Sequence, residues 1–462
     1  MKLPIPADIL IQTPGAYLVG GSVRDLICKR RPVDYDIAVA NDAKGYAQQL
    51  AAKLNGRIVV IGKPDYPLYR IVKARHVIDV TPIKGTSIET DLADRDFTIN
   101  ALACELINGR LIDTCGGLAD IRQGVVRMVS AQALQNDPVR MVRAFRLAAL
   151  LNFTIAAATS QAISTQAKGI DTCAGERIWA EMALILAQPN SFHTLQLMVK
   201  SGLLLAILPE LVPLQDCRQN KPHRLDVFEH TLEAYASLEM LLGQPDRHFT
   251  GRALDWVHTL SAHRLVLLKL ALLLHDIGKP AQRTIEASGK IHFYGHPAAG
   301  ARLAEAILSR LRLSRRQIRW ALFLIAHHSR PHDLFLAEQK NELTPKAIGR
   351  FLRLGGDATP YLILHAMADN YGKALTDRGQ LAARLTFFNS LLDAYYKTAR
   401  PQETPPLVDG HDLMATFKLK SSPLIGTLIN GIEEARLAGT ITHRRQALTW
   451  AETYLKENGI LT

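Results

Sequence analysis

The first part of the chain alternates short runs of β-branched and aromatic residues with segments whose apolar residues recur at helical spacing. The runs are A-Y-L-V at 16–19, Y-D-I-A-V-A at 35–40, R-I-V-V-I at 57–61, L-Y-R-I-V at 68–72 and V-I-D-V at 77–80. Such alternation predicts a small mixed sheet packed on helices. From about residue 126 the strand pattern stops and the 3.6-residue apolar period of helices takes over. The predicted fold class is therefore α+β, with a mixed-sheet head followed by helical regions.

Two interruptions divide the helical part. The stretch Q-D-C-R-Q-N-K-P-H-R lies near residue 215, and R-P-Q-E-T-P-P lies near residue 400. Prolines and polar clusters of this kind mark loops between helical segments. The pattern predicts a head over 1–125, a helical neck and body over 126–215, a histidine-rich helical domain over 216–400 and a helical tail over 401–462.

Composition narrows the classes of protein to which this chain can belong. A chain of 462 residues has room for several domains, and its apolar fraction of 48% is that of a globular protein. The net charge of +12 attracts a polyanion, with nucleic acid as the first candidate. Five scattered cysteines without a C-x-x-C pair favour a reducing compartment. Prolines interrupt the N-terminus, and Lys269 interrupts the longest apolar run, so we expect a cytoplasmic protein without a membrane partner.

The stretch Y-L-V-G-G-S-V-R-D at 17–25 places two glycines between a strand and a predicted helix. Gly20 and Gly21 carry no β-carbon, so the backbone can turn sharply and let a ligand approach its N–H groups. Arg24 follows about one helical turn later and can reach phosphate oxygens. The alternative from this stretch alone is an ordinary strand-to-helix turn with a surface arginine.

Carboxylates follow on the predicted strands. Asp34 and Asp36 are two residues apart, so both lie on one face of their strand. Like charges side by side usually indicate a cation between them, and Asp79 in V-I-D-V is a third candidate ligand. Oxygen ligands of this kind suit two Mg²⁺ ions that also bind substrate phosphates. The alternative is a solvated strand edge.

Four motifs occur in a fixed order: G-G-x-V-R-D, D-x-D, D-R-D-F-T-I-N-A-L-A at 94–103 and N-D-P-V-R-M-V-R-A-F-R at 136–146. This order resembles the class II tRNA nucleotidyltransferase and bacterial poly(A) polymerase family. The resemblance implies that the Gly20–Gly21 turn, Arg24 and Arg95 bind the nucleotide. It also implies that Asp34 and Asp36 hold Mg²⁺, that Asp79 is the third catalytic carboxylate, and that an RNA 3′-hydroxyl attacks the α-phosphate.

The neck carries a basic stripe. Asp137 and Pro138 have the pattern of a helix N-cap followed by proline, and Arg140, Arg143 and Arg146 follow at intervals of three. In the family, positions matching Asp137 and Arg140 select C or A through their Watson–Crick edges, and those matching Arg143 and Arg146 approach the nucleotide. Two departures occur, because Asn136 replaces a usual acid and Asp94 replaces a common arginine.

Histidine and aspartate concentrate in one helical region, in the motifs F-E-H-T-L, L-L-L-H-D-I-G-K-P, F-Y-G-H-P, I-A-H-H-S-R-P and H-A-M-A-D-N. Imidazole and carboxylate together suit divalent metals such as Mn²⁺, Fe²⁺ or Ni²⁺. The order resembles the HD superfamily of metal-dependent phosphohydrolases. The resemblance implies a ligand set of His230, His275, Asp276 and Asp369, with His296 and His327 as additional ligands, and hydrolysis of phosphate esters.

The leading hypothesis is an enzyme that adds all or part of CCA to the tRNA 3′ end from CTP and ATP. The alternatives are a poly(A) polymerase, and an HD phosphohydrolase whose head merely binds RNA or nucleotide. In the family, a flexible loop after the third-carboxylate strand is associated with the switch from C to A. Here only fifteen residues separate Asp79 from Arg95, and I-E-T-D-L-A within them predicts a helix. Addition of CC alone or A alone is therefore an open alternative to full CCA addition.

Overall fold

The computed structural model describes residues 9–32, 34–63, 66–73, 76–220, 225–373, 378–397, 406–437 and 439–461. The chain divides into two compact units, Met1–Ile207 and Leu208–Thr462. The predicted break near 400 lies outside the described residues, and the four predicted domain ranges stay predictions.

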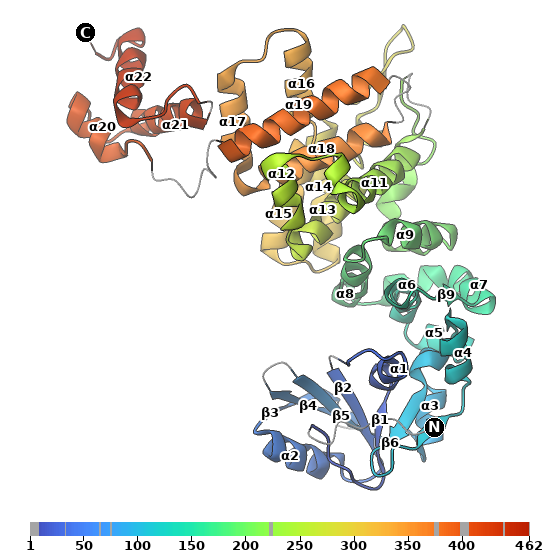
Figure 1. Cartoon of the computed structure of the whole chain (residues 1–462). Coiled ribbons are helices and arrows are strands. Elements are labelled where there is room, and N and C mark those ends of the chain that lie inside the picture. The colour runs from blue at the N-terminus through green and yellow to red at the C-terminus, as the bar shows by residue number, and fades with distance from the viewer. Residues whose placement is uncertain are drawn as a thin grey trace. The chain divides into compact units, whose positions relative to one another are not determined.

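The head is a seven-stranded sheet in the order β3-β4-β5-β2-β1-β6-β7 (Figure 1). Its strands are β1 (Ala16–Val19), β2 (Asp34–Val39), β3 (Arg57–Lys63), β4 (Tyr66–Lys73), β5 (His76–Pro82), β6 (Leu102–Glu105) and β7 (Leu111–Asp113). Strands β2 and β5 run parallel, and the other neighbours are antiparallel. The five predicted strands are confirmed. The prediction lacked β6 and β7, which are short and are held by pairing with β1 and with each other.

The two faces of β2 have different roles. Tyr35, Ile37 and Val39 point into an apolar core that includes helix α2 (Ala43–Leu54). On the opposite face Ala38 belongs to a small apolar cluster with Ile88 of helix α3 (Ile88–Ala93). Because side chains alternate along a strand, the residues at 34 and 36 share the face of Ala38. That face is apolar at one end of β2 and acidic at the other.

The rest of the first unit is mainly helical. Its helices are α1 (Gly21–Ile27), α4 (Gly117–Gln123), α5 (Ala131–Asn136), α6 (Val139–Leu151), α7 (Ala157–Gln166), α8 (Gly175–Leu186), α9 (Ser191–Lys200) and α10 (Leu203–Ile207). A short parallel pair, β8 (Val125–Val126) with β9 (Thr154–Ile155), ties α4 and α6 together, although the sequence predicts no strands there. Helix α6 buries one face, including Val142 and Phe145, and leaves its arginines partly accessible.

The second unit is almost entirely helical, as predicted. Its helices are α11 (Val227–Gly243), α12 (Gly251–His258), α13 (Ala262–Leu274), α14 (His296–Arg310), α15 (Arg315–His327), α16 (Arg330–Gln339), α17 (Pro345–Gly355), α18 (Thr359–Gly372), α19 (Arg378–Lys397), α20 (Gly410–Phe417), α21 (Pro423–Leu437) and α22 (Arg444–Glu457). A hairpin of β10 (Thr284–Ile285) and β11 (Ile291–His292) precedes α14. Capping boxes start α11 at Asp226 and α15 at Ser314.

Within the described residues no single helix has both the length and the apolar character needed to cross a bilayer. The pair α12 and α13 meets both criteria together, but the two helices are bent by 101°.

Candidate functional site

Three carboxylates meet at neighbouring strands of the head. The parallel register pairs Asp36 on β2 with Asp79 on β5, and Asp34 lies two residues earlier on the same face as Asp36. Asp34 and Asp36 are exposed, whereas Asp79 is largely covered. Arg70 on β4 binds Asp79 through two hydrogen bonds of 2.8 and 2.7 Å. The structure thus brings together the three predicted acids. It also places the Arg70 guanidinium beside them, which the sequence did not indicate.

The electrostatics of this edge favour a cation. Surrounding protein atoms desolvate the Asp36 carboxylate and, with Asp79 and Asp34 close by, raise its pKa to about 6, although Arg95 and Arg70 act in the opposite direction. Asp36 is nevertheless open to solvent, so its carboxylate lies in an accessible hollow rather than a sealed core. A divalent cation would relieve the repulsion between these acids. The acidic, oxygen-only donor set therefore fits Mg²⁺.

The Gly-Gly turn lies directly against this acidic edge. Gly20 has φ of 72°, and a β-carbon on it would lie 2.9 Å from Nη1 of Arg95 and 3.6 Å from Oδ2 of Asp36. A side chain at residue 20 would therefore be strained and would displace Arg95. Gly21 begins α1. The predicted turn residues, Arg95 and the carboxylates are brought together.

Ser22 fixes the carboxylate strand to the turn. Its buried hydroxyl donates to the carbonyl oxygen of Asp34 at 3.0 Å and accepts from the N–H of Asp36 at 3.2 Å. Both bonds hold the backbone from which the two carboxylates project. The sequence shows Ser22 inside the glycine motif, but its partners are twelve and fourteen residues away, so this role was not predicted.

The two arginines of the predicted nucleotide site are held by acids. Arg24 is buried, and its guanidinium binds Asp25 at 2.7 Å and Asn100 Oδ1 at 2.7 Å. Arg95 binds the buried Asp91 carboxylate through two bonds of 3.1 and 2.8 Å. Arg95 Nη1 is the group that faces Gly20. In this structure Arg24 therefore acts within the protein, while Arg95 keeps one nitrogen at the acidic edge.

The arginine stripe of α6 is matched by acids from other elements. Arg143 donates to Asp96 at 3.1 Å and to Glu181 on α8 at 2.9 Å, and Arg146 donates to the second oxygen of Glu181 at 2.5 Å. Burial would raise the pKa of Asp96, but Arg143, Asn100 and the Phe97 N–H together hold it below its usual value. These two arginines therefore tie α6 to the D-R-D-F-T-I-N segment and to α8.

Asp137 is not the N-cap of α6, which corrects the predicted N-cap. It follows the last residue of α5, and α6 begins at Val139 without a side-chain cap. The Asp137 carboxylate instead accepts two hydrogen bonds from Arg177 on α8, of 3.0 and 2.8 Å. Arg140 lies 3.8 Å from Asp137 and donates to backbone carbonyls of Ala133 and Asp94. Both Arg177 and Glu181 come from the segment E-R-I-W-A-E at 176–181, which begins in the first turn of α8.

Glu181→Gln is expected to lower the stability of the first unit by about 1–3 kcal/mol, because two partly buried guanidiniums lose their shared charge partner. Hydrogen exchange of the α6 amides measures the loss. Glu176→Gln is the matched control, since Glu176 is exposed on the first turn of the same helix. Equal exchange rates in the two variants would contradict the bridging role of Glu181.

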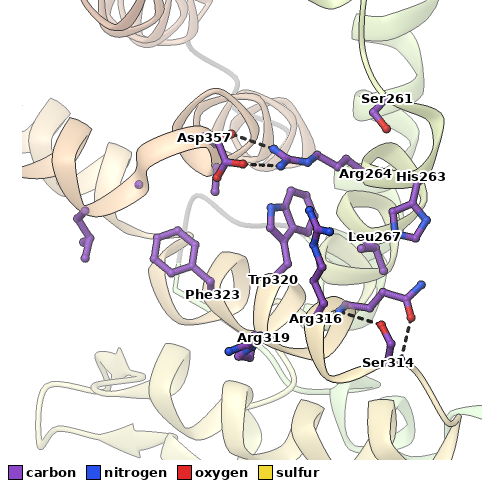
Figure 2. A pocket seen from close by; sticks show the side chains of 14 residues that line it. Ser261, His263, Arg264, Leu267, Ser314, Arg316, Arg319, Trp320, Phe323 and Asp357 are labelled. Carbon is purple, nitrogen blue, oxygen red and sulfur yellow. Dashed lines mark hydrogen bonds and ion pairs between the residues drawn. The ribbon is translucent and has the colours of Figure 1, made fainter. Parts of the chain in front are cut away.

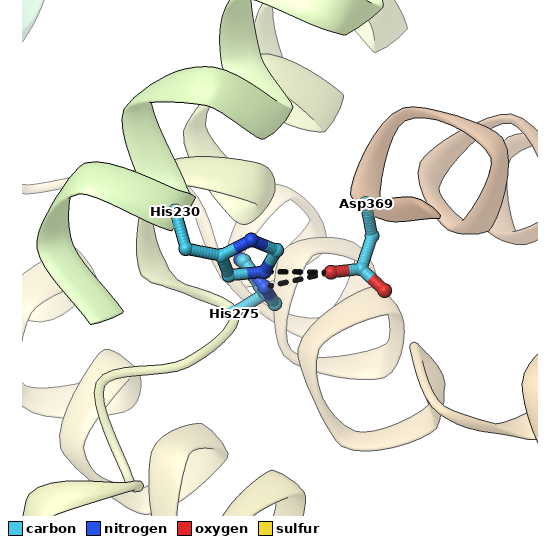
Figure 3. A group of neighbouring side chains, drawn as sticks. All are labelled: His230, His275 and Asp369. Carbon is cyan, nitrogen blue, oxygen red and sulfur yellow. Dashed lines mark hydrogen bonds and ion pairs between the residues drawn. The ribbon is translucent and has the colours of Figure 1, made fainter. Parts of the chain in front are cut away.

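The second unit contains two groups of metal-ligating side chains. The first consists of His230 on α11, His275 at the end of α13 and Asp369 on α18, all buried (Figure 3). Asp369 Oδ1 lies 2.9 Å from His230 Nε2 and 3.6 Å from His275 Nε2. Ring Nδ1 atoms face backbone carbonyls, at 3.2 Å for His230 and 2.8 Å for His275, which leaves Nε2 for the group.

The second group is formed by Asp276, His296 and His328. Oδ1 of Asp276 lies 3.4 Å from Nε2 of His296 and 3.8 Å from Nε2 of His328. This corrects the prediction of His327, whose ring packs on Phe323 instead. Successive residues of a helix point about 100° apart, so in a His-His pair only one ring faces the site. The other five predicted ligands all belong to the two groups.

Several buried polar atoms in this region have no hydrogen-bond partner, and a bound metal would satisfy them. Among the described residues, Nε2 of His275 and both oxygens of Asp276 are buried without a hydrogen bond of normal geometry. Both ring nitrogens of His365, four residues before Asp369, are in the same state, and its ring lies 5.1 Å from that of His275. Buried unsatisfied polar groups are costly. The residues therefore fit a divalent metal. The sequence analysis took only Asp369 from the H-A-M-A-D-N motif and missed His365.

Two lysines partly balance the acids. Lys279 Nζ lies 2.6 Å from Asp276, and Lys373 Nζ lies 2.7 Å from Asp369. Burial opposes the charge of both aspartates, but His275 and Lys279 hold the pKa of Asp276 well below its usual value, and Lys373 and His230 do the same for Asp369. Both carboxylates are therefore ionised and able to act as ligands.

Three family models match the chain: the poly A polymerase head domain over residues 16–127, the probable RNA and SrmB-binding site of polymerase A over 152–214, and the HD domain over 227–371. The A-adding tRNA nucleotidyltransferase of Deinococcus radiodurans is 32% identical, over 96% of each chain. The CC-adding tRNA nucleotidyltransferase of Thermus thermophilus is 30% identical, over 95% of this chain and 94% of its own. The CC-adding enzyme of Synechocystis is 28% identical, over 98% and 96%.

Solved structures share the fold. A CCA-adding enzyme with ATP has a TM-score of 0.65 at 20% identity, covering 96% of this chain and 90% of its own. The Thermotoga maritima CCA-adding enzyme complexed with tRNA has a TM-score of 0.64 at 21% identity, covering 95% and 91%. These three relatives align over nearly their whole length and are named tRNA nucleotidyltransferases, so a poly(A) polymerase is not favoured. The chain belongs to the tRNA nucleotidyltransferase family and carries an HD domain.

Proposed function

We propose that this enzyme adds part of the CCA end to tRNA, either CC or the final A, from CTP or ATP. The observation that carries the proposal is the connection between Asp79 and Arg95, which is short and internally bonded. Helix α3 occupies six of its fifteen residues and starts with a capping box between Ser87 and Thr90. The Lys84 N–H donates to Asp91 Oδ1 at 3.0 Å, and the Lys84 ammonium pairs with Asp94.

A pocket that first selects C and then A must change its contacts between additions. Asp91 holds this connection together. It lies within α3, and its carboxylate accepts hydrogen bonds from the Lys84 N–H before the helix and from the Arg95 guanidinium after it. Movement of the segment would break these bonds near the acidic edge. A fixed segment favours one base preference, which agrees with relatives named for A addition and for CC addition.

For the chemistry, we propose that Asp34 and Asp36 hold Mg²⁺ beside the Gly20–Gly21 turn. The metal would supply charge neutralisation for the triphosphate. The tRNA 3′-hydroxyl oxygen forms a bond to the α-phosphorus, the bond to pyrophosphate breaks, and the hydroxyl proton passes to solvent. Arg95 Nη1 and the turn N–H groups would orient the phosphates, and Arg70 would fix Asp79.

Base selection is proposed for Asp137 and Arg140. Each Asp137 oxygen accepts one bond from Arg177, and a carboxylate oxygen has a second lone pair. An exocyclic amine of C or A can therefore still donate to it. The Arg140 Nε is buried without a hydrogen bond, which leaves a donor for a ring nitrogen. Where C and A present an amine beside a ring acceptor, U and G present a carbonyl oxygen beside a ring N–H, so neither would pair with this carboxylate and donor.

The test of partial addition uses three tRNA substrates, ending before the first C, after the first C and after the second C. Each is given CTP, ATP or both, and the products are sequenced. We expect extension of the first two by C only, or of the third by A only. Completion of CCA on all three substrates would contradict partial addition, while leaving the tRNA nucleotidyltransferase assignment intact.

The HD domain supports a second proposed activity, because the two ligand groups adjoin one another through Asp276 and His275. We propose hydrolysis of phosphate esters, such as 2′,3′-cyclic phosphates at RNA ends, with Mn²⁺, Fe²⁺ or Ni²⁺. The Nε2 atoms and carboxylates named above would hold the metal, and Lys279 would stabilise the phosphate charge.

A further inference from the structure

A separate pocket lies in the second unit, between the start of α13, the first turns of α15 and the end of α17 (Figure 2). Its volume is about 710 Å³, which is within the range of small-molecule sites. No residue that lines it belongs to the two His–Asp groups. The pocket therefore has no part in the proposed HD chemistry.

The lining of this pocket is strongly basic. It contains Arg264, Arg316 and Arg319 but a single acid, Asp357. The Arg264 guanidinium already pairs with the Asp357 carboxylate. It also donates to the Asp357 carbonyl oxygen at 3.3 Å. Arg316 and Arg319 are exposed and have no ion pair with any described residue. Two guanidiniums are therefore available to an anion.

Trp320 adds an aromatic wall and an unused donor. It follows Arg316 by four residues, so the two side chains are neighbours on one face of α15. The Trp320 Nε1 atom is buried and has no hydrogen-bond acceptor among the described residues. Its ring is fixed by edge-on contact with Tyr361, with centroids 5.2 Å apart. A fixed indole beside two free guanidiniums suits a ligand with a planar ring, a hydrogen-bond acceptor and negative charge.

We propose that this pocket binds a nucleotide, with its phosphate on Arg316 and Arg319 and its base against Trp320. A free nucleotide and a nucleotide unit of bound RNA have the same chemistry. A simple anion would use the arginines alone and leave the indole without a role. This site is additional to the nucleotide site of the head, and the proposal does not depend on partial CCA addition.

The test measures binding to the full chain in EDTA, which disfavours the metal-dependent triphosphate site of the head. The probes are AMP and a 12-nucleotide single-stranded RNA. Arg316→Ala with Arg319→Ala, and Trp320→Leu, are each expected to weaken binding at least about tenfold, since one stacked base or phosphate contact is worth roughly 1–3 kcal/mol. The matched control is Arg302→Ala with Lys346→Ala, which removes two exposed cations elsewhere in the domain.

Weakened AMP binding in the pocket variants identifies a free-nucleotide site, and weakened RNA binding alone identifies a site for RNA. Photocrosslinking with 8-azido-AMP and with 4-thiouridine RNA, mapped by mass spectrometry, should label residues 314–323. Trp320→Phe keeps an aromatic ring and removes Nε1, so it tests the donor while a surface for stacking remains. Equal binding by pocket and control variants, together with no label in 314–323, would overturn the proposal.

Discussion

Asp36→Asn is expected to lower the rate of nucleotide incorporation by at least about a thousandfold, because it removes a metal ligand from the site where charge develops. The substitution keeps the size of the side chain. It also removes a carboxylate that is desolvated and repelled by Asp79 and Asp34, so stability at neutral pH is not expected to fall. Loss of activity without loss of stability would separate a chemical role from a structural one.

The measurement is incorporation of labelled CTP or ATP into tRNA at saturating Mg²⁺, with stability followed by thermal denaturation. Asp42→Asn is the matched control, since Asp42 caps α2 through the Gly45 N–H and asparagine caps equally well. We expect the control to keep full activity. Retention of activity by Asp36→Asn to within about tenfold would make the metal assignment to Asp36 wrong.

His275→Ala is expected to remove phosphohydrolase activity, by at least about a hundredfold, while nucleotide incorporation stays unchanged. His275 is fully buried and contacts Asp276 at 3.1 Å, so its loss disrupts both ligand groups. The assay uses 2′,3′-cyclic nucleotides with Mn²⁺ or Ni²⁺, and metal content is measured by mass spectrometry.

The adjacent histidines give a matched pair for the same assay. His328→Ala should reduce metal content and hydrolysis, whereas His327→Ala should leave both unchanged, since only His328 faces Asp276. The reverse order would restore the sequence-based choice of His327. Joint loss of hydrolysis and nucleotide addition in His275→Ala would indicate a structural metal instead.

Local patterns predicted much of this molecule. Alternating residues in β2 placed Asp34 and Asp36 on one face, and four of the five His/Asp motifs, interpreted through the family resemblance, located five of the six metal-ligand candidates that the structure groups. Periodicity could not separate His327 from His328, because both follow the same helical motif and only tertiary packing decides which ring faces inward. Strands β6 and β7 are too short for a pattern of their own.

The partners of the arginines could not be predicted for a different reason. These partners lie 35 to 47 residues apart in the sequence. Glu181 and Asp96 bind arginines of α6, and Arg177 binds Asp137. Sequence spacing carries no information about such contacts without the fold. The acid that pairs with two arginines of the α6 stripe is on α8, and the packing of α8 against α6 brings it there.

The lysines beside Asp276 and Asp369 matter for how this protein is handled in the laboratory. Their ammonium groups already offset the charge of both carboxylates, so the helices around them do not need a cation in order to stay together. A sample purified with a chelating agent is therefore expected to keep its fold, with a melting temperature lowered only by the loss of metal binding. It would lack hydrolytic activity although folded, so a negative assay carries weight only when metal content is measured on the same sample.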